Sequence, residues 1–315
     1  MSKQPLIDQL DQAVTEILAN PAIEPSSVDA SLVEMLQLAR DLKGLPRPDF
    51  KARLRSELER KASMSTKIVQ FRQGFRTVTP YLLPPSGDFI DFAKRVFAAE
   101  ETERTVTSPN SFHAELRIGD SMLMIGVGSN RSMPARLLVH VLNADEVYQH
   151  ALEAGAVSLE PMIEDHGSRF GCVQDPAGNQ WCISTYLGKS YTPENLHTLT
   201  TTFHPQGAAK FIEFLKASFK AQELERYDSE DGTVLWSIIK IGDSAVAVSE
   251  PGRHSWTRPM PMMTYLYVPD ADAIYDQALR AGAQSIHPPA DQFYGDRNGG
   301  VTDAWGNQWY MATPL

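Results

Sequence analysis

From about residue 71 onward, hydrophobic and polar residues alternate in short runs with the period of β-strands. In residues 111–117, for example, Phe112, Ala114 and Leu116 fall on one face and polar side chains on the other. Stretches with the wider spacing of amphipathic helices separate these runs. The order is one strand, one helix and three strands, and this unit occurs four times along the chain. The pattern predicts an α+β fold built from βαβββ units.

The expected elements have the following bounds. The pattern predicts helices over residues 89–97, 144–154, 208–219 and 271–281. It predicts strands over residues 77–83, 111–117, 122–127, 137–142, 157–162, 171–174, 181–186, 199–204, 234–240, 245–249, 263–268, 299–303 and 308–312.

Residues 1–70 differ from the rest, because their apolar positions predict three short helices. Ser31 and Glu34 form a capping-box pattern at the start of the second helix. The third helix is rich in charge, which is more typical of a solvated face with internal ion pairs than of a site for an acidic partner. Three short helices bury little surface alone, so we expect this segment to pack on the rest of the chain or on a second subunit, as in a homodimer.

Three sequence strings occur twice in the same order. Ile-Gly-Asp-Ser at 118–121 returns at 241–244, Ala-Gly-Ala at 154–156 returns at 281–283, and the Asp-x-x-Gly-Asn-Gln-Trp string at 175–181 returns at 303–309. Three shared strings at similar spacing indicate a duplicated domain. The expected organisation is a helical segment over 1–70, a first domain over 71–190 and a second domain over 191–315.

Composition narrows the class of protein. The net charge of -10 argues against broad nucleic-acid binding. No run of about 18 apolar residues predicts a membrane span. No basic region followed by an apolar core marks a secretory signal, so we expect a cytoplasmic protein that binds neither nucleic acid nor a membrane.

Three local motifs carry a resemblance to a known superfamily. They are the string 268–272 leading through a helix to 281–283, the string Tyr-Gly-Asp-Arg at 294–297, and the duplicated string at 175–181. Over residues 72–315 the chain resembles the glyoxalase/bleomycin-resistance/extradiol-dioxygenase group, the vicinal oxygen chelate superfamily. The resemblance implies tandem domains of paired βαβββ units that form cupped mixed sheets, with a ligand in each cup. It also implies either a divalent metal held by His and Glu in catalytic members, or metal-free binding of drugs such as bleomycin.

The positions where the superfamily places metal ligands are mostly occupied by other residues here. Cys182 and Tyr310 stand where a Glu is common, and Arg136 and Met263 stand near the usual histidine. A lone Cys is weak evidence for a metal in this superfamily. We therefore predict no cofactor, although a divalent metal stays possible.

Another ligand set could replace the usual one. His113 and Glu115 share one face of an expected strand, and with His140 they could form a metal triad or, as a pair, an acid and a base. The alternative is that His113 and Glu115 are polar lining and that His140 is a buried histidine with its hydrogen bonds satisfied.

The two copies differ mainly by aromatic residues in the second. An aromatic site for a flat ligand is expected from Trp236, Tyr265, Tyr267, Trp305 and Tyr310. The alternative is that these side chains fill the cup as core.

Two further pairs of residues have open interpretations. Arg169 and Arg297 occupy matching positions, where they could bind an anionic ligand or pair with carboxylates such as Asp165 and Asp296. Cys172 and Cys182 flank a turn; we expect two reduced, partly buried thiols, with a redox pair as the sharper alternative.

Three functions follow from these patterns. The first is a metal-free protein that binds or sequesters a small, partly aromatic molecule. The second is a metal-dependent lyase, isomerase or dioxygenase that uses His113 and Glu115. The third is an interaction or regulatory protein that oligomerises through the N-terminal helices. The patterns leave open whether the chain is an enzyme.

Overall fold

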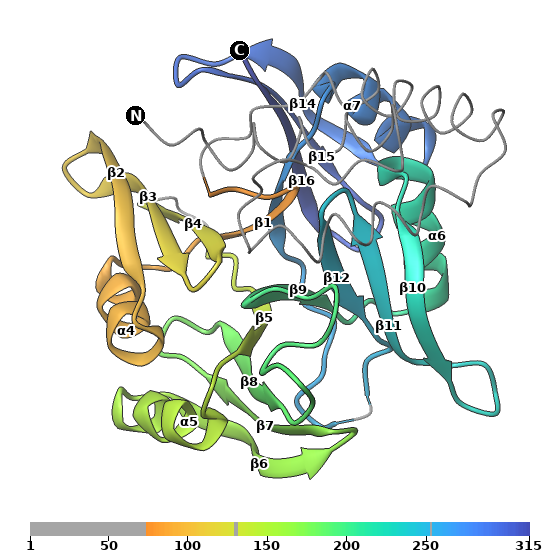
Figure 1. Cartoon of the computed structure of the whole chain (residues 1–315). Coiled ribbons are helices and arrows are strands. Elements are labelled where there is room, and N and C mark those ends of the chain that lie inside the picture. Colours follow the sequence, from red (N-terminus) through yellow and green to blue (C-terminus); the bar gives the residue numbers. More distant parts are fainter. Residues whose placement is uncertain (1–73, 129–131, 253) are drawn as a thin grey trace, which may run out of the picture. The chain divides into compact units, whose positions relative to one another are not determined.

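Four βαβββ units follow one another along the chain, and their strands combine into two eight-stranded sheets (Figure 1). The computed structural model describes residues 74–128, 132–252 and 254–315. The α+β class and the four predicted units are confirmed. The helices predicted before residue 70, and the homodimer contact expected from them, lie outside the described residues.

The elements of the four units have these bounds. The first unit contains β1 (Val78–Leu82), α4 (Asp88–Phe97), β2 (Glu100–Ser108), β3 (Ser111–Ile118) and β4 (Ser121–Val127). The second contains β5 (Arg136–His140), α5 (Ala144–Glu153), β6 (Val157–Asp165), β7 (Ser168–Gln174) and β8 (Gln180–Tyr186). The third contains β9 (Leu199–Phe203), α6 (Ala208–Phe219), β10 (Gln222–Asp228), β11 (Val234–Ile241) and β12 (Ser244–Val248). The fourth contains β13 (Met263–Tyr267), α7 (Ala271–Arg280), β14 (Gln284–Asp291), β15 (Asp296–Thr302) and β16 (Gln308–Pro314).

The sequence pattern does not predict strands β2, β10 and β14. All three lie at the edges of their sheets. None of their residues is fully buried. A strand without a buried face has no need of alternating hydrophobic residues, so its sequence carries no strand signal.

The two sheets combine the units in an order that the chain does not follow. The first sheet has the strand order β14-β15-β16-β13-β1-β4-β3-β2 and joins units one and four. The second sheet has the order β10-β11-β12-β9-β5-β8-β7-β6 and joins units three and two. Antiparallel pairing of β1 with β13 joins the two units at the centre of the first sheet. Antiparallel pairing of β5 with β9 does the same in the second sheet. Each sheet therefore takes four strands from each of the expected halves, 71–190 and 191–315.

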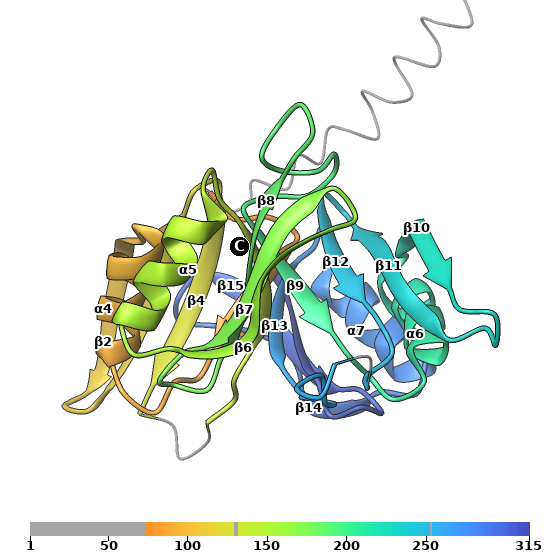
Figure 2. The ribbon, with the colours of Figure 1, turned by 90° about the horizontal axis from the view of Figure 1, so that it is seen from below.

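The helices pair within each half instead. Helix α4 packs beside α5, and α6 packs beside α7, as Figure 2 shows on opposite sides of the molecule. The fully buried Trp181 and Trp309 pack against one helix of each pair. The ring of Phe97 in α4 lies 4.5 Å from Trp181, and that of Phe219 in α6 lies 4.8 Å from Trp309. Each duplicated Trp thus ties its own unit to the helix of the preceding unit.

The duplicated turns before these tryptophans have the same hydrogen bonds. The carboxylate of Asp175 accepts from two backbone N–H groups at 2.9 Å, from Asn179 Nδ2 at 2.8 Å and from Trp181 Nε1 at 2.9 Å. Asp303 repeats all four bonds with the corresponding groups, including Trp309 Nε1 at 2.9 Å. The shared string therefore specifies a turn and its packing.

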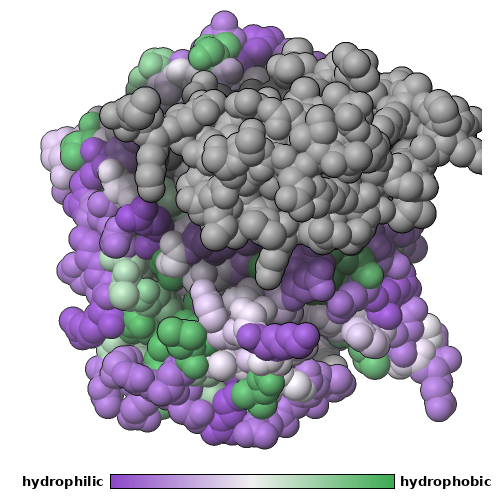
Figure 3. Space-filling view, in the orientation of Figure 1, coloured by the Kyte–Doolittle hydropathy of each residue, from purple (hydrophilic) through white to green (hydrophobic). Residues whose placement is uncertain are grey.

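One face of the described surface is mostly polar. On the face that Figure 3 shows, hydrophilic residues predominate and hydrophobic ones form small patches. Small apolar patches are normal on protein surfaces. No helix within the described ranges is both long and apolar enough to cross a membrane.

Candidate functional site

Tyrosine side chains gather on the side of the first sheet that faces away from the helices. Alternation along β13 places Leu266 in the core and leaves Tyr265 and Tyr267, which are 7% and 0% exposed, on the opposite face. Tyr81 of β1 and Tyr310 of β16 lie at the margin of the same cluster. We call these four residues the tyrosine cluster.

The rings of the tyrosine cluster are close together. Tyr265 and Tyr310 are nearly parallel, with ring centroids 6.5 Å apart. The rings of Tyr265 and Tyr267 are 5.1 Å apart. Two glycines make room, since a Cβ at Gly126 would lie 3.0 Å from Tyr81 Oη and one at Gly300 would lie 3.0 Å from a Tyr310 ring carbon. The result is a largely buried aromatic layer across neighbouring strands, which also contacts Phe75, Met122 and Met124.

Polar groups border this aromatic layer at both ends. On one side, the hydroxyl of Tyr81 lies 3.1 Å from His113 Nδ1, and His113 Nε2 lies 3.6 Å from Glu115 Oε1. On the other side, the hydroxyl of Tyr265 donates to Asp296 Oδ2 at 3.0 Å. Glu115 and Asp296 are 4% and 5% exposed. A carboxyl group thus lies at each end of a row of phenols and one imidazole.

Tyr81 and Tyr265 stay protonated at neutral pH. Burial, with the nearby hydroxyls of Tyr294 and Tyr310, raises the pKa of Tyr81 to about 12. Burial, with the nearby Tyr294 and Asp296, also raises the pKa of Tyr265 well above its usual range. These hydroxyls can therefore act as hydrogen-bond donors and acceptors.

The prediction that five aromatic residues form one site is wrong, because the structure separates them. The structure brings Tyr265, Tyr267 and Tyr310 together, but Trp236 lies on the second sheet. Trp305 belongs to the core, where its ring is 5.0 Å from Phe211 of α6 and its Nε1 donates to a backbone carbonyl at 2.8 Å. The reason is the crossed pairing of the units, which puts units three and four into different sheets.

The predicted metal triad is also separated. His113 and Glu115 lie on β3 of the first sheet, whereas His140 lies on β5 of the second. His140 is buried, and its Nδ1 lies 3.3 Å from the backbone oxygen of His197. This fits a buried histidine with its hydrogen bond satisfied. Among the residues that the structure describes, no three His, Cys, Asp or Glu side chains come together as a metal site.

The residues at the superfamily's usual ligand positions do not suit a metal either. In the second sheet these positions hold Arg136, a cation, and Cys182, whose sulfur is bonded to Cys172. In the first sheet they hold Met263 and Tyr310. Divalent metals of this kind prefer imidazole and carboxylate ligands. The residues present do not fit the metal that the fold implies.

The matching arginines stabilise helices and do not face the tyrosine cluster. Arg169 Nε donates to Asp145 of α5 at 2.9 Å. Arg297 Nε donates to Asp272 of α7 at 2.6 Å, and its Nη1 donates to Asp291 at 2.9 Å. The structural interpretation is confirmed, but the predicted partners Asp165 and Asp296 are wrong, because both arginines point to the helix side of their strands.

The two cysteines form a disulfide, so the prediction of reduced thiols is wrong. Cys172 of β7 and Cys182 of β8 are direct partners in the antiparallel register. Their Cα atoms are 4.1 Å apart. The turn between them sets this register, which the sequence could only suggest.

Sequence reasoning missed two members of the row, Tyr81 and Asp296. Tyr81 had a usable signal, because it falls in an expected strand on the face opposite Val78 and Leu82. Asp296 was considered only as a partner for Arg297. Only the pairing of β13, β16 and β15 brings it to Tyr265.

The duplicated Ile-Gly-Asp-Ser turns join the two sheets. Asp120 Oδ1 accepts from the N–H of Thr198 at 2.9 Å, and Asp243 Oδ1 accepts from the N–H of Thr77 at 2.8 Å. In both copies the serine of the string accepts from the next N–H, at 3.1 and 3.0 Å. The turn of each sheet therefore caps the first strand of a unit in the other sheet.

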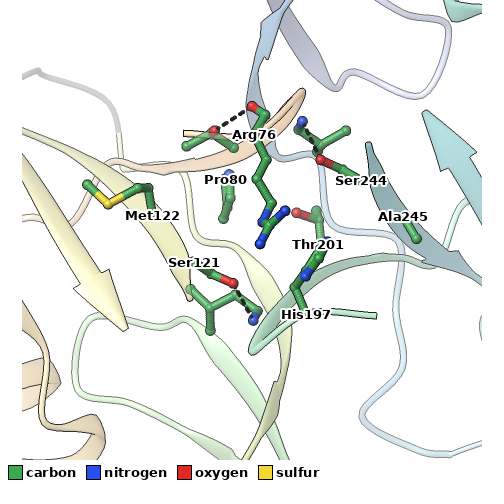
Figure 4. A pocket seen from close by; sticks show the side chains of 11 residues that line it. Arg76, Pro80, Ser121, Met122, His197, Thr201, Ser244 and Ala245 are labelled. Carbon is green, nitrogen blue, oxygen red and sulfur yellow. Dashed lines mark hydrogen bonds between the residues drawn. The ribbon is translucent and has the colours of Figure 1, made fainter. Parts of the chain in front are cut away.

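A small pocket lies at this junction (Figure 4). Figure 4 shows the Arg76 side chain pointing toward His197 and Thr201. Asp120 accepts from Arg76 Nη2 at 3.2 Å and lies 2.9 Å from His197 Nδ1. Burial alone would raise the pKa of Asp120, but hydrogen bonds from Thr198 and other neighbours lower it to about 2. These groups hold the sheets together, so the tyrosine cluster is the stronger candidate site.

Comparison with known proteins places the fold. The solved structure of glyoxalase I from Zea mays is 10% identical, with a TM-score of 0.59, over 75% of this chain and 92% of that one. A putative dioxygenase from Bacillus subtilis is 12% identical, with a TM-score of 0.52, over 75% of this chain and 84% of that one. At these identities the likeness shows the fold alone. The fold is that of the glyoxalase/bleomycin-resistance/dioxygenase superfamily, as the motifs imply.

Sequence relatives give the family but no activity. No family model matches the chain. An uncharacterised protein of Mycobacterium bovis is 32% identical over 117 residues, which cover 34% of this chain and 77% of that protein. An uncharacterised protein of Mycobacterium tuberculosis is equally similar, and the match covers 69% of it. The chain belongs to the family of these mycobacterial proteins.

Proposed function

We propose that the chain binds a small, partly aromatic molecule on the face of its first sheet opposite the helices, without a metal. The observation that carries the proposal is the tyrosine cluster with a carboxyl group at each end. Flat rings stack favourably on aromatic side chains, and a few polar groups fix the orientation of a ligand. The ligand we propose is therefore a flat molecule with hydrogen-bonding groups at both ends.

Calorimetric titration with proflavine, a flat acridine with an amino group at each end, tests this function. We expect saturable binding to the full chain and about fivefold weaker binding to Tyr310→Ala, since one aromatic contact contributes about 1 kcal/mol. Tyr227→Ala is the matched control, because Tyr227 is 61% exposed on β10 of the second sheet. Equal affinity in all three proteins would overturn the proposal.

The metal-free part of the proposal has its own measurement. We expect the same proflavine affinity before and after dialysis against a chelator. Loss of binding on chelation, restored by one added divalent metal, would contradict this part alone.

One observation favours an enzymatic alternative. His113 lies between the hydroxyl of Tyr81 and the carboxyl of Glu115, an arrangement that can relay a proton. An isomerase or lyase of this superfamily would use His113 as the acid or base. Glyoxalase-type isomerisation that His113→Gln abolishes, while proflavine binding persists, would establish this alternative; absence of turnover would remove its support.

A further inference from the structure

A buried arginine lies on the face of the second sheet opposite the helices. Arg136 begins β5, whose Leu137 and Val139 point into the core, and it is 1% exposed. Its Nε donates to Gln180 Oε1 at 2.6 Å, and its Nη2 donates to the carbonyl of Arg258 at 3.4 Å. A guanidinium has five N–H donors, so these contacts use two of them.

The positive charge of Arg136 has no counter-ion in the part of the chain that the structure describes, because none of the ion pairs there, with N and O within 4.0 Å of each other, includes Arg136. The ring of Trp256 lies 5.6 Å from its guanidinium carbon. Burial lowers the pKa of Arg136 to about 10, so it still carries its charge at neutral pH. A buried charge without a partner is costly, and a bidentate anion is the group that a guanidinium pairs with best.

The neighbouring ionisable groups do not replace that anion. Burial, and then the nearby charge of Arg136, lowers the pKa of His204 to about 3, so its ring is neutral. The Nδ1 atom of His204 lies 2.7 Å from the hydroxyl of Ser249. Glu160 is occupied by Trp256 Nε1 at 2.8 Å and by His254 Nδ1 at 3.0 Å.

An apolar patch shares this face of the sheet. It consists of the buried Ile238, Ala245 and Ala247, with the partly buried Leu196 and Trp236 against them. The strand order β11-β12-β9-β5 puts the patch and Arg136 within three strand spacings, about 14 Å at about 4.8 Å per strand. A molecule with an acidic end and an apolar body can span that distance.

We propose that the face of the second sheet opposite the helices binds an apolar carboxylic acid. Arg136 is the counter-ion of the carboxylate, and the patch around Trp236 contacts the apolar part of the molecule. One guanidinium matches one negative charge, which favours a carboxylate over a phosphate dianion. The site is separate from the tyrosine cluster. This proposal therefore holds or fails independently of the function proposed for the first sheet.

The test is calorimetric titration of the full chain with 4-phenylbutyrate, its neutral amide 4-phenylbutanamide, and inorganic phosphate. We expect saturable binding of the acid and at least tenfold weaker binding of the other two. Arg136→Gln is expected to lower the affinity for 4-phenylbutyrate at least tenfold. Arg136→Lys is expected to lower it less, because lysine keeps the positive charge but loses the bidentate geometry of the guanidinium. Arg258→Gln is the matched control, because it removes the same charge from an exposed side chain. Arg258 lies in the loop between β12 and β13, here called the covering loop, which contacts Arg136 through the Arg258 carbonyl and the Trp256 ring.

Folding of each variant is checked by circular dichroism. If Arg136→Gln fails to fold, Arg136→Lys and Trp236→Ala carry the test, with a threefold or greater loss of affinity expected in each. Absence of binding by the parent protein, equal binding of the amide, or equal losses in Arg136→Lys and Arg258→Gln would overturn the proposal. Phosphate that binds more tightly than the acid would overturn the carboxylate assignment.

Discussion

Mild acid is expected to destabilise this protein through two buried histidines, His140 and His204. Burial lowers the pKa of His140 to about 4 and that of His204 to about 3, from an ordinary value of 6.5. The folded state therefore keeps both rings neutral, whereas the unfolded chain takes up protons below pH 6.5. The stability that depends on the neutral rings is complete above pH 6.5 and is lost as the pH falls toward 4 and 3.

The magnitude follows from the size of these shifts. Each histidine costs about 1.4 kcal/mol per pH unit once the unfolded chain is protonated. Between pH 7.5 and pH 5.0 this amounts to about 2 kcal/mol for each ring and about 4 kcal/mol for both. Asp120 adds little in this range, because its low pKa of about 2 makes its contribution fall away only below about pH 4.

Urea unfolding followed by tryptophan fluorescence at the two pH values measures the loss. The variant His140→Asn is expected to lose only about 2 kcal/mol between pH 7.5 and pH 5.0, whatever its stability at pH 7.5. His166→Asn is the control, because the His166 side chain is 79% exposed and Asn tolerates its positive φ of 46°. If His140→Asn shows the same pH dependence as the parent protein, the burial argument is refuted.

Three structural changes give further predictions. Gly119→Ala and Gly242→Ala should each lower the free energy of unfolding by about 2 kcal/mol or more, because both glycines have positive φ (57° and 61°) and a Cβ would overlap a threonine hydroxyl of the other sheet; urea unfolding checks this, and full stability would contradict it. Asp303→Ala should cost about 4 kcal/mol in urea unfolding, since it leaves two backbone and two side-chain donors without their acceptor; a loss under about 1 kcal/mol would argue against the turn network. Reduction of the Cys172–Cys182 disulfide, which closes a separation of 10 residues, should cost about 3 kcal/mol; the double variant C172S/C182S should unfold identically with and without reductant.

Hydrophobic alternation predicted the buried strands well, because a strand with one face in the core must place apolar residues at every second position. The same rule fails for β2, β10 and β14, whose residues are exposed or only partly buried. The duplicated string at 175–181 and 303–309 encodes its turn locally, since it holds both the donors and the acceptors of its hydrogen bonds. Asp175 and Trp181, six residues apart, are one such pair.

The candidate site was predictable only in part. The sequence placed His113 and Glu115 on one strand face and named Tyr265, Tyr267 and Tyr310 as aromatic lining. It could not separate these tyrosines from Trp236 and Trp305, or His113 from His140. The buried charge of Arg136 also became visible only when the strands and the covering loop were in place.

By itself, the sequence determined the βαβββ units, their duplicated turns and the fold class, because these depend on residues close together along the chain. The tertiary structure decided which units share a sheet, and hence which side chains meet. Pairs such as Thr79 with Tyr265 in the first sheet join strands far apart in the sequence. An alternating strand encodes which of its faces is buried, but its backbone hydrogen bonds are the same for any neighbour, so the pairing is set only by the packing of the whole chain.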